Sequence, residues 1–156
     1  MAKYYAGIGS RETPLDVLQI MKASAVRLST DGYTLRSGRA KGADSWFEMG
    51  ATDKEIFTAK SDIPLWAFAT VDQYHPNPSA LSDYAKRLHA RNAMILIGES
   101  RTTPADFVIC WTKDGKDTGG TGQAIRLAKD ENIPIYNLFY KDVRDSFVTE
   151  LKDYFS

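Results

Sequence analysis

Three glycine-containing turns carry most of the residues in this chain that could do chemistry. They read Gly7-Ile8-Gly9-Ser10-Arg11, Ser37-Gly38-Arg39-Ala40-Lys41-Gly42-Ala43-Asp44 and Thr118-Gly119-Gly120-Thr121-Gly122-Gln123. Glycine lets backbone N–H groups come close to an anionic oxygen, while serine, arginine and lysine side chains add further donors and positive charge. The three turns therefore predict a site for a phosphate group.

The first turn begins like the dinucleotide-binding fingerprint Gly-x-Gly-x-x-Gly but does not complete it. Glu12 stands where the third glycine belongs, and the second expected strand ends in Arg36 and Ser37 instead of an acid that would bind ribose. We therefore reject a nicotinamide dinucleotide site and expect phosphate binding by Gly9, Ser10 and Arg11. The alternative is a tight structural turn with an exposed arginine.

The second turn precedes a short expected helix over residues 43–50, whose positive N-terminal end would face a ligand. The expected binding residues here are Ser37, Gly38, Arg39, Gly42 and Ala43. Asp44 and Glu48 lie four residues apart, so both could face the same cleft as catalytic carboxylates. The alternatives are a helix-capping role for Asp44 and a solvated helix position for Glu48.

The third turn has the highest glycine content and lies between a buried strand and an amphipathic helix. It is not a Walker loop, because no lysine follows its last glycine. A purely structural loop rarely contains so many glycines, since each one costs conformational entropy. We expect phosphate binding by Gly119, Gly120, Thr121, Gly122 and Gln123.

Three further positions lie outside these turns. Arg91 and Asn92 fall within an expected helix and are predicted to hold ribose or phosphate, the alternative being an exposed polar face. Trp111 ends an apolar run, where it could stack on a base or fill the core. Cys110 belongs to the same run and is expected to be inert.

Short apolar runs alternate with helical patterns along the whole chain. Strands are expected over residues 4–8, 33–37, 55–59, 107–111 and 133–138, and helices over about 14–30, 43–50, 79–96, 123–131 and 142–154. This alternation predicts the α/β class, as a single Rossmann-like three-layer α/β/α domain over residues 1–156 with a mainly parallel five-stranded sheet. Turns that follow parallel strands meet at one sheet edge, where strand order reverses.

One long segment has no clear period. Residues 60–78 contain three prolines and are expected to be irregular. Loops of this length in a compact domain are commonly functional. Its aromatic residues Trp66, Phe68 and Tyr74 are therefore candidates for a lid or an oligomer contact, or they cover the core.

The composition excludes several classes of function. The 156 residues include 20 Lys+Arg and 20 Asp+Glu, a formal net charge of zero that disfavours duplex DNA as a partner. One cysteine and two histidines are too few for a disulfide or a zinc site, and we expect no metal and no cofactor. No apolar run approaches a signal-peptide core or a membrane span, so a cytoplasmic location without membrane contact is expected.

Taken in order, these motifs resemble the SLOG superfamily. This superfamily includes the Lonely Guy phosphoribohydrolases, DNA-processing protein A and the YpsA-like proteins, and the sequence is most similar to small stand-alone members common in bacteriophages. The resemblance covers about residues 4–138. It implies a Rossmannoid fold, a nucleotide-like ligand, and a homodimer or higher homo-oligomer, in the host cytoplasm if the chain is phage-encoded.

The chain departs from the Lonely Guy motif Pro-Gly-Gly-x-Gly-Thr-x-x-Glu at three positions, with Thr118 in place of the proline, Gln123 in place of the threonine and Arg126 in place of the glutamate. The catalytic glutamate of that motif falls on Arg126, which cannot accept a proton from water or stabilise a cationic sugar. Arg126 would instead join Arg11, Arg39, Lys41 and Arg91 as cations around the ligand.

Three hypotheses follow. The protein hydrolyses the N-glycosidic bond of a nucleotide, with Glu48 or Asp44 as the carboxylate. Alternatively, it binds without turnover, as a nucleotide sensor or as a sponge that sequesters a signalling nucleotide in phage anti-defence. The third hypothesis is single-stranded DNA binding, which the zero net charge disfavours.

Overall fold

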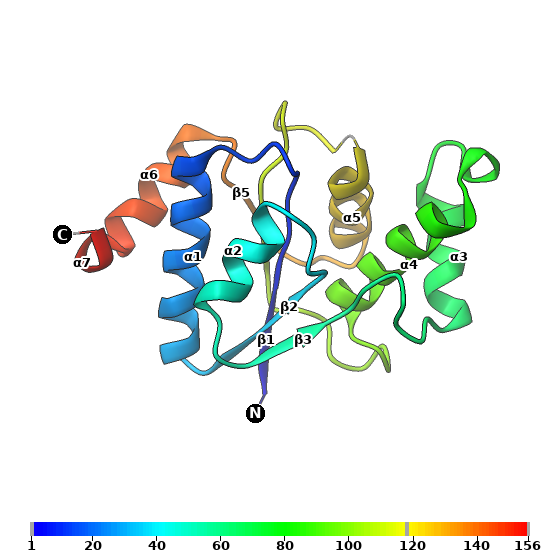
Figure 1. Ribbon diagram of the computed structural model, residues 1–156, viewed down its shortest axis with the longest axis horizontal. Coiled ribbons are helices and arrows are strands. Elements are labelled where there is room, and N and C mark those ends of the chain that lie inside the picture. Colours follow the sequence, from blue (N-terminus) through cyan, green and yellow to red (C-terminus); the bar gives the residue numbers. More distant parts are fainter. Residues whose placement is uncertain (1, 118, 156) are drawn as a thin grey trace.

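A computed structural model describes residues 2–117 and 119–155, in which five strands form one central sheet (Figure 1). The strands are β1 (Lys3–Gly7), β2 (Tyr33–Ser37), β3 (Lys54–Ile56), β4 (Val108–Cys110) and β5 (Ile135–Asn137). They lie in the order β3-β2-β1-β4-β5, and every neighbouring pair is parallel. The expected parallel five-stranded sheet is confirmed.

Helices cover both faces of this sheet (Figure 1). One face carries α1 (Leu15–Thr30), α2 (Ala43–Gly50) and α6 (Lys141–Glu150), followed by α7 (Lys152–Phe155); the other carries α3 (Leu65–Tyr74), α4 (Asp83–Ile97) and α5 (Gly119–Asp130). A 3-10 turn spans Pro78–Ala80. The result is the three-layer α/β/α arrangement of a Rossmann-like domain.

Strand β4 shows how the sheet separates two cores. Val108 and Cys110 belong to the core beneath α3, α4 and α5, whereas Ile109 belongs to the core beneath α1 and α2. Successive side chains of a strand point to opposite faces, so a strand buried on both faces has a continuous apolar sequence. The apolar run over 107–111 is therefore explained.

The expectation of an irregular segment over residues 60–78 is wrong, because α3 occupies most of it. Ala67 and Val71 lie one helical turn apart and are both buried. Trp66, Phe68 and Tyr74 are partly buried and pack against the core below them. These aromatic side chains cover the core, and the lid or interface interpretation is not needed to explain them.

The boundaries of two other helices differ from expectation. Helix α5 begins at Gly119, so the third glycine segment forms the first turn of the helix instead of a loop before it. Helix α4 begins at Asp83, where the Oγ of Ser82 accepts a hydrogen bond from the backbone N–H of Ala85. This capping serine ends the irregular segment before α4.

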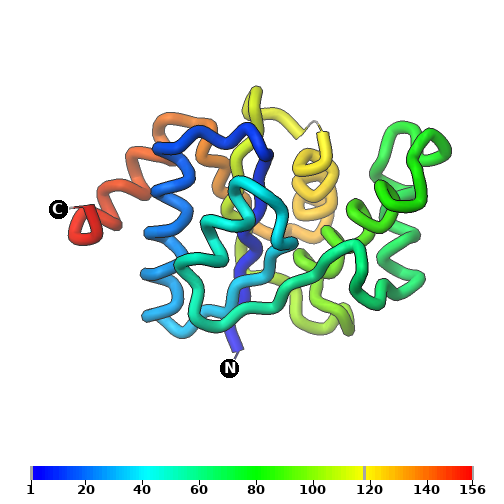
Figure 2. Tube along the Cα trace, in the orientation of Figure 1, coloured from blue at the N-terminus to red at the C-terminus, as the bar shows by residue number. Residues whose placement is uncertain are grey.

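The strand order reverses next to β1. After β3 the chain passes to the other side of the sheet to form α3 and α4 (Figure 2) before it returns as β4 beside β1. In open α/β sheets a crevice forms at such a switch point, outside the carboxyl ends of the strands. This is the edge at which the predicted turns lie.

Candidate functional site

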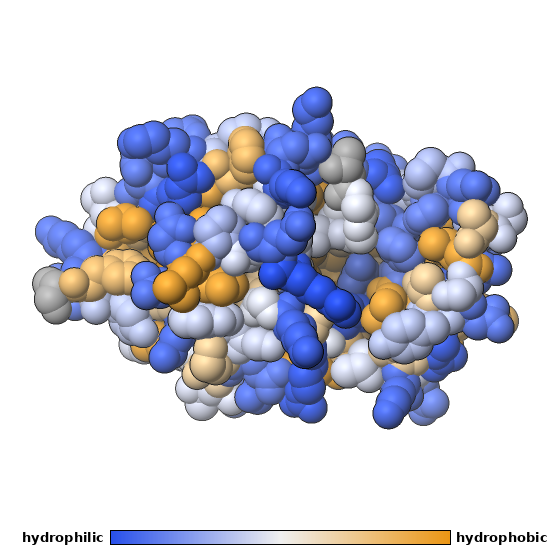
Figure 3. Space-filling view, turned by 45° about the horizontal axis from the view of Figure 1, so that its top comes forward, coloured by the Kyte–Doolittle hydropathy of each residue, from blue (hydrophilic) through white to orange (hydrophobic). Residues whose placement is uncertain are grey.

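A cleft of about 670 Å³ lies at this edge of the sheet. It is bounded by the segments after β1, β2 and β3, by one side of α4 and by the first turn of α5. In Figure 3 a hollow near the middle of the surface lies beside a band of strongly hydrophilic side chains. Ten of the residues expected at the site or around the ligand line the cleft: Gly9, Arg11, Gly38, Arg39, Lys41, Asp44, Arg91, Asn92, Gly120 and Thr121.

The lining of the cleft is strongly biased toward positive charge. Among its described residues are five with cationic side chains, Arg11, Arg39, Lys41, Lys60 and Arg91, against one with a carboxylate, Asp44. The first turn of α5 adds backbone N–H groups that have no partner within the helix, and the positive end of the helix dipole. A protein with zero net charge thus has a locally positive cleft.

Arg91 lies against the turn after β2. Its Nη1 donates to the carbonyl oxygens of Gly38 at 2.7 Å and Phe57 at 3.0 Å, and its Nε donates to that of Leu88 at 3.1 Å. A Cβ on Gly38 would lie 1.7 Å from Nη1, so only glycine lets the guanidinium take this position. Gly38 therefore leaves the space that the guanidinium of Arg91 occupies in the cleft.

Asp44 lies in the first turn of α2 and is 4 % exposed. Its Oδ2 accepts a hydrogen bond from the N–H of Ala40 at 3.2 Å. Burial raises the pKa of Asp44 to about 6, although the positive charge of Arg91 and the hydrogen bonds that Asp44 accepts oppose this rise. A carboxyl group whose pKa lies this close to neutrality suits proton transfer.

Glu48, the other candidate carboxylate, does not line the cleft. Its carboxylate accepts hydrogen bonds from Arg39, with Nε–Oε1 at 3.1 Å and Nη2–Oε2 at 3.0 Å, and lies 3.1 Å from the Nζ of Lys54. The hydrogen bond from Arg39 is the main reason that the pKa of Glu48 lies below its ordinary value. The structure therefore places Glu48 in an ion-pair network beside the cleft.

Five other predicted residues pack beneath the segments that bound the cleft but do not line it. The Ser37 Oγ donates to the carbonyl of Gly7 at 2.6 Å, and the Ser10 Oγ accepts from the N–H of Glu12. Gly42 and Ala43 pack the start of α2 against the first turn; a Cβ on Gly9 would lie 2.6 Å from that of Ala43. Trp111 belongs to the core under α1, so it fills the core and does not stack on a ligand from the cleft.

The glycines of α5 have different surroundings. A Cβ on Gly122 would lie 2.2 Å from the backbone of Asp117, whereas one on Gly119 would meet nothing within 4 Å. Gly119 and Gly122 do not line the cleft, and neither does the buried Gln123. Thr118 lies outside the described residues.

Arg126 does not join the cations of the cleft. Its Nη1 donates to the carbonyl of Asp117, and its Nε and Nη2 donate to that of Tyr74 at 3.2 and 3.0 Å. Arg126 therefore connects α5 to the end of α3, and the expectation that it surrounds the ligand is not supported by its position.

Several lining residues were missed by sequence reasoning. Thr58, Ala59 and Lys60 follow β3, and the rule that parallel strands end at one edge could have identified them. Tyr84, Ala85, Leu88 and His89 precede Arg91 on α4 at spacings that put them on one side of a helix. Counting back from Arg91 and Asn92 in steps of three and four residues along the expected helix would have identified them.

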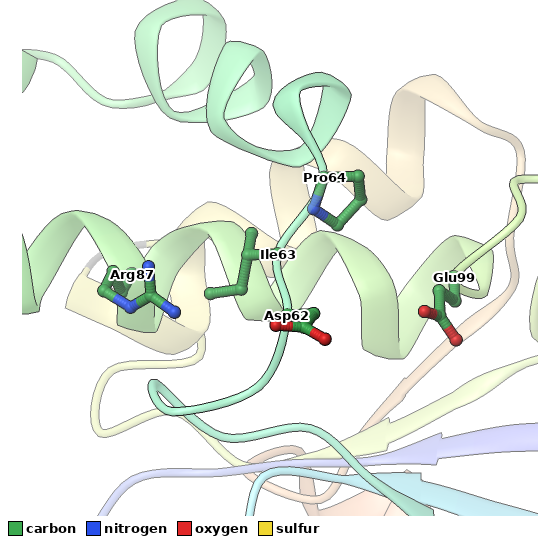
Figure 4. A pocket seen from close by; sticks show the side chains of 5 residues that line it. All are labelled: Asp62, Ile63, Pro64, Arg87 and Glu99. Atoms are coloured by element: carbon green, nitrogen blue, oxygen red, sulfur yellow. The ribbon is translucent and has the colours of Figure 1, made fainter.

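A second pocket beside α4 lacks such convergence (Figure 4). Arg87 and Glu99 lie at its two ends with Asp62 between them. Arg87 already donates to the carbonyl oxygens of Ala59 and Ser61, and the two acidic residues disfavour an anion.

Two further observations limit the chemistry. Residues 2–117 and 119–155 contain no group of three or more histidine, cysteine or acidic residues placed to hold a metal ion. Burial raises the pKa of Cys110 to about 12, so its thiol is unreactive at neutral pH.

None of the helices in the described part of the chain has the length and apolar composition needed to cross a bilayer.

Comparison with known proteins supports the fold. No protein-family model and no curated protein matches the sequence. Among solved structures, that of DNA processing protein A from Helicobacter pylori, reported for its single-stranded DNA binding mode, is similar at a TM-score of 0.61 and 19% identity, over 97% of this chain and 81% of that chain. The chain therefore shares its fold with DNA processing protein A, one of the proteins that the sequence motifs resemble.

Proposed function

We propose that the cleft at the carboxyl edge of the sheet binds a nucleotide through its phosphate. The observation that carries this proposal is the meeting of five cationic residues with the first turn of α5 in one cleft. Helix N-termini are ready sites for phosphate, because their free N–H groups and the helix dipole both favour negative charge. The volume of about 670 Å³ is typical of a small-ligand pocket.

Different lining residues would contact the two parts of the nucleotide, its phosphate and its nucleoside. Gly120 and Thr121 of α5, together with Arg91, would hold the phosphate. Asn92 and Tyr84 of α4 offer an amide, a hydroxyl and an aromatic ring to the sugar and base. Arg11 and Lys41, both exposed, would attract the anion to the cleft.

The experiment is calorimetric titration of the full chain with nucleoside monophosphates, comparing Lys41→Glu with Lys152→Glu. Lys41 lines the cleft, whereas Lys152 lies on α7 and does not. Each substitution changes the net charge by the same amount, and we expect only Lys41→Glu to weaken binding, by about tenfold. Equal losses in the two variants, or no binding by the unmodified chain, would contradict the proposal.

If the bound nucleotide is turned over, we propose that Asp44 is the reacting carboxylate. It is the acidic residue among the described lining residues, and its raised pKa suits a general acid or base at the glycosidic bond. Release of free base that stops in Asp44→Asn, with binding retained, would support hydrolysis. Recovery of unchanged nucleotide would indicate a sensor or sponge.

A second candidate function is single-stranded DNA binding, and the structural neighbour favours it. In that case the cleft would take one phosphate of a longer strand. Binding of a strand releases counterions, so affinity would rise with oligonucleotide length and fall steeply with salt. Equal affinity for a mononucleotide and a ten-residue oligonucleotide would exclude this second candidate.

A further inference from the structure

His89 has an unusual environment for a residue that lines the cleft. It lies on α4 between the positions of Leu88 and Arg91. Its Nδ1 is buried and has no hydrogen-bond partner among the described residues. A buried nitrogen without a partner destabilises the folded state, so its presence calls for an explanation.

The carbon edge of the imidazole faces the start of α5. The Cε1 of His89 lies 3.8 Å from the position that a Cβ on Gly120 would take, and among the described residues beyond the chain neighbours of Gly120 and the backbone of its own helix no other atom comes within 4 Å of that position. The space above Gly120 is therefore open, with His89 as its nearest neighbour. Backbone N–H groups in the first turn of a helix lack partners within the helix.

A half-turn of the ring changes which atom faces this space. Rotation by half a turn about the Cβ–Cγ bond exchanges Cε1 with Nε2 and Nδ1 with Cδ2, while the ring keeps nearly the same volume. Such a rotation about a terminal bond between sp³ and sp² atoms is broad and roughly two-fold. It moves Nδ1 to the present position of Cδ2 and brings Nε2 to the present position of Cε1, beside Gly120.

We infer that His89 is an anion-binding residue of the cleft, whose ring makes this half-turn so that its Nε2–H donates a hydrogen bond to a phosphate oxygen at the first turn of α5. This inference rests on the proposed function, because it needs an anion in the cleft. It adds a donor from α4 to the N–H groups of α5. The phosphate is then held from two helices.

The neutral imidazole provides this donor. Burial lowers the pKa of His89, and the effect is reinforced by His75, by Arg126 of α5 and by Arg91 of α4. The ring centroid of His75, which follows α3, lies 5.1 Å from that of His89. Across the cleft Asp44 of α2 balances part of the charge of Arg91. A neutral ring with its proton on Nε2 needs no added charge to bind the anion.

The test is nuclear magnetic resonance of the full chain during titration with inorganic phosphate and then adenosine 5′-monophosphate. We expect the amide signals of Gly120 and Thr121 to shift, together with the imidazole nitrogens of His89 toward the Nε2–H tautomer. His89→Phe keeps an aromatic ring but removes the donor, and it should weaken phosphate binding by about tenfold. Tyr154→Phe, which also replaces a polar ring by phenylalanine, is the matched control, because Tyr154 lies on α7 and does not line the cleft, and its affinity should stay unchanged.

The outcomes separate this inference from the proposed function. Amide shifts at Gly120 and Thr121 with an unchanged His89 imidazole would overturn the role of His89 and leave nucleotide binding standing. The imidazole signals are measured in the unmodified chain, so this result does not depend on how well His89→Phe folds. If neither phosphate nor the nucleotide moves the two amides, the proposed function fails and the role of His89 fails with it.

Discussion

Two arginines are buried in this molecule, and they are bonded differently. Arg36 of β2 is 2 % exposed and Arg91 of α4 is 8 % exposed. All three guanidinium nitrogens of Arg36 donate: Nε to Glu55 at 2.7 Å, Nη1 to the carbonyl of Thr103 and Nη2 to its Oγ1 at 2.7 Å. The guanidinium also lies 3.9 Å from the ring centre of Tyr4. In Arg91, Nε and Nη1 donate to carbonyl oxygens, whereas Nη2 donates to no residue in the described ranges.

The difference shows that burial of a cation does not by itself indicate a binding site. Arg36 has a carboxylate partner, Glu55, and each of its three guanidinium nitrogens donates to the protein, so its charge and all three nitrogens are engaged within the fold. The carbonyl partners of Arg91 are uncharged, and Asp44 nearby is itself partly protonated near pH 6. Arg91 therefore keeps both positive charge and an available donor at the edge of the cleft.

The largest effect expected from the comparison of the two arginines is the loss of stability in Arg36→Met. This substitution removes three hydrogen bonds and a cation–π contact from a buried position, whereas Glu55 stays partly in water, so we expect the free energy of unfolding to fall by about 2–4 kcal/mol. Urea denaturation measures the loss. Nucleotide affinity of the folded protein should not change, because Arg36 does not line the cleft.

The control for this experiment is Arg27→Met, which breaks an exposed ion pair with Asp31. Exposed pairs of this kind contribute at most about 1 kcal/mol. If the two substitutions cost the same, or if Arg36→Met abolishes binding in a stable protein, the structural assignment of Arg36 is wrong.

The next largest effect concerns Asp44, the acid beside Arg91. Folding raises its pKa from 3.8 to about 6, so the unfolded chain loses this proton at lower pH than the folded protein does. The contribution of Asp44 to stability is therefore greatest below about pH 4 and is lost as the pH rises through about 6, in total about 3 kcal/mol.

Asp44→Asn should remove that pH dependence. Denaturation curves of both proteins between pH 4 and 7 should show a free energy of unfolding that falls more steeply with pH in the unmodified chain. Parallel profiles would show that folding does not perturb Asp44. Asp53→Asn, a substitution of an acid outside the cleft, is the matched control.

The available donor of Arg91 should appear in ligand affinity. Arg91→Lys keeps the charge but cannot reproduce the planar fork of donors, and we expect nucleotide binding about 10–100-fold weaker by calorimetry. Arg36→Lys makes the same chemical change at the fully bonded arginine. If both variants lose affinity equally, the two arginines do not differ in the way the hydrogen bonds indicate.

Much of the fold could be predicted from the sequence, for physical reasons. The continuous apolar run around Ile109 indicates a strand buried on both faces, and alternation with helices requires a parallel sheet. Helix α3 was missed because the prolines around it obscured the short period of Ala67 and Val71. The start of α5 was missed because glycine has poor helix propensity, which tertiary contacts overcome.

For the candidate site, the sequence could predict which segments meet but not how each side chain lies. The turn after β2 lies at the cleft because the strand order fixes the edge at which it lies. The positions of single side chains depend on contacts between distant segments. Arg126 donates to carbonyls from two other segments, and Glu48 pairs with Lys54 of β3; neither contact has a local sequence signal.

Glu48→Gln should produce the smallest effect and sharpens the contrast with Asp44. The substitution removes the charge that pairs with Arg39 and Lys54 at the edge of α2, where water screens the interaction, so we expect a stability loss below about 1 kcal/mol. Release of Arg39 from its partner leaves one more free cation in the lining of the cleft, so nucleotide affinity should stay the same or rise slightly. Any base release should continue in Glu48→Gln and stop in Asp44→Asn. Loss of base release in Glu48→Gln with unchanged binding would instead identify Glu48 as the reacting carboxylate, which would have to leave its ion pairs to reach the ligand.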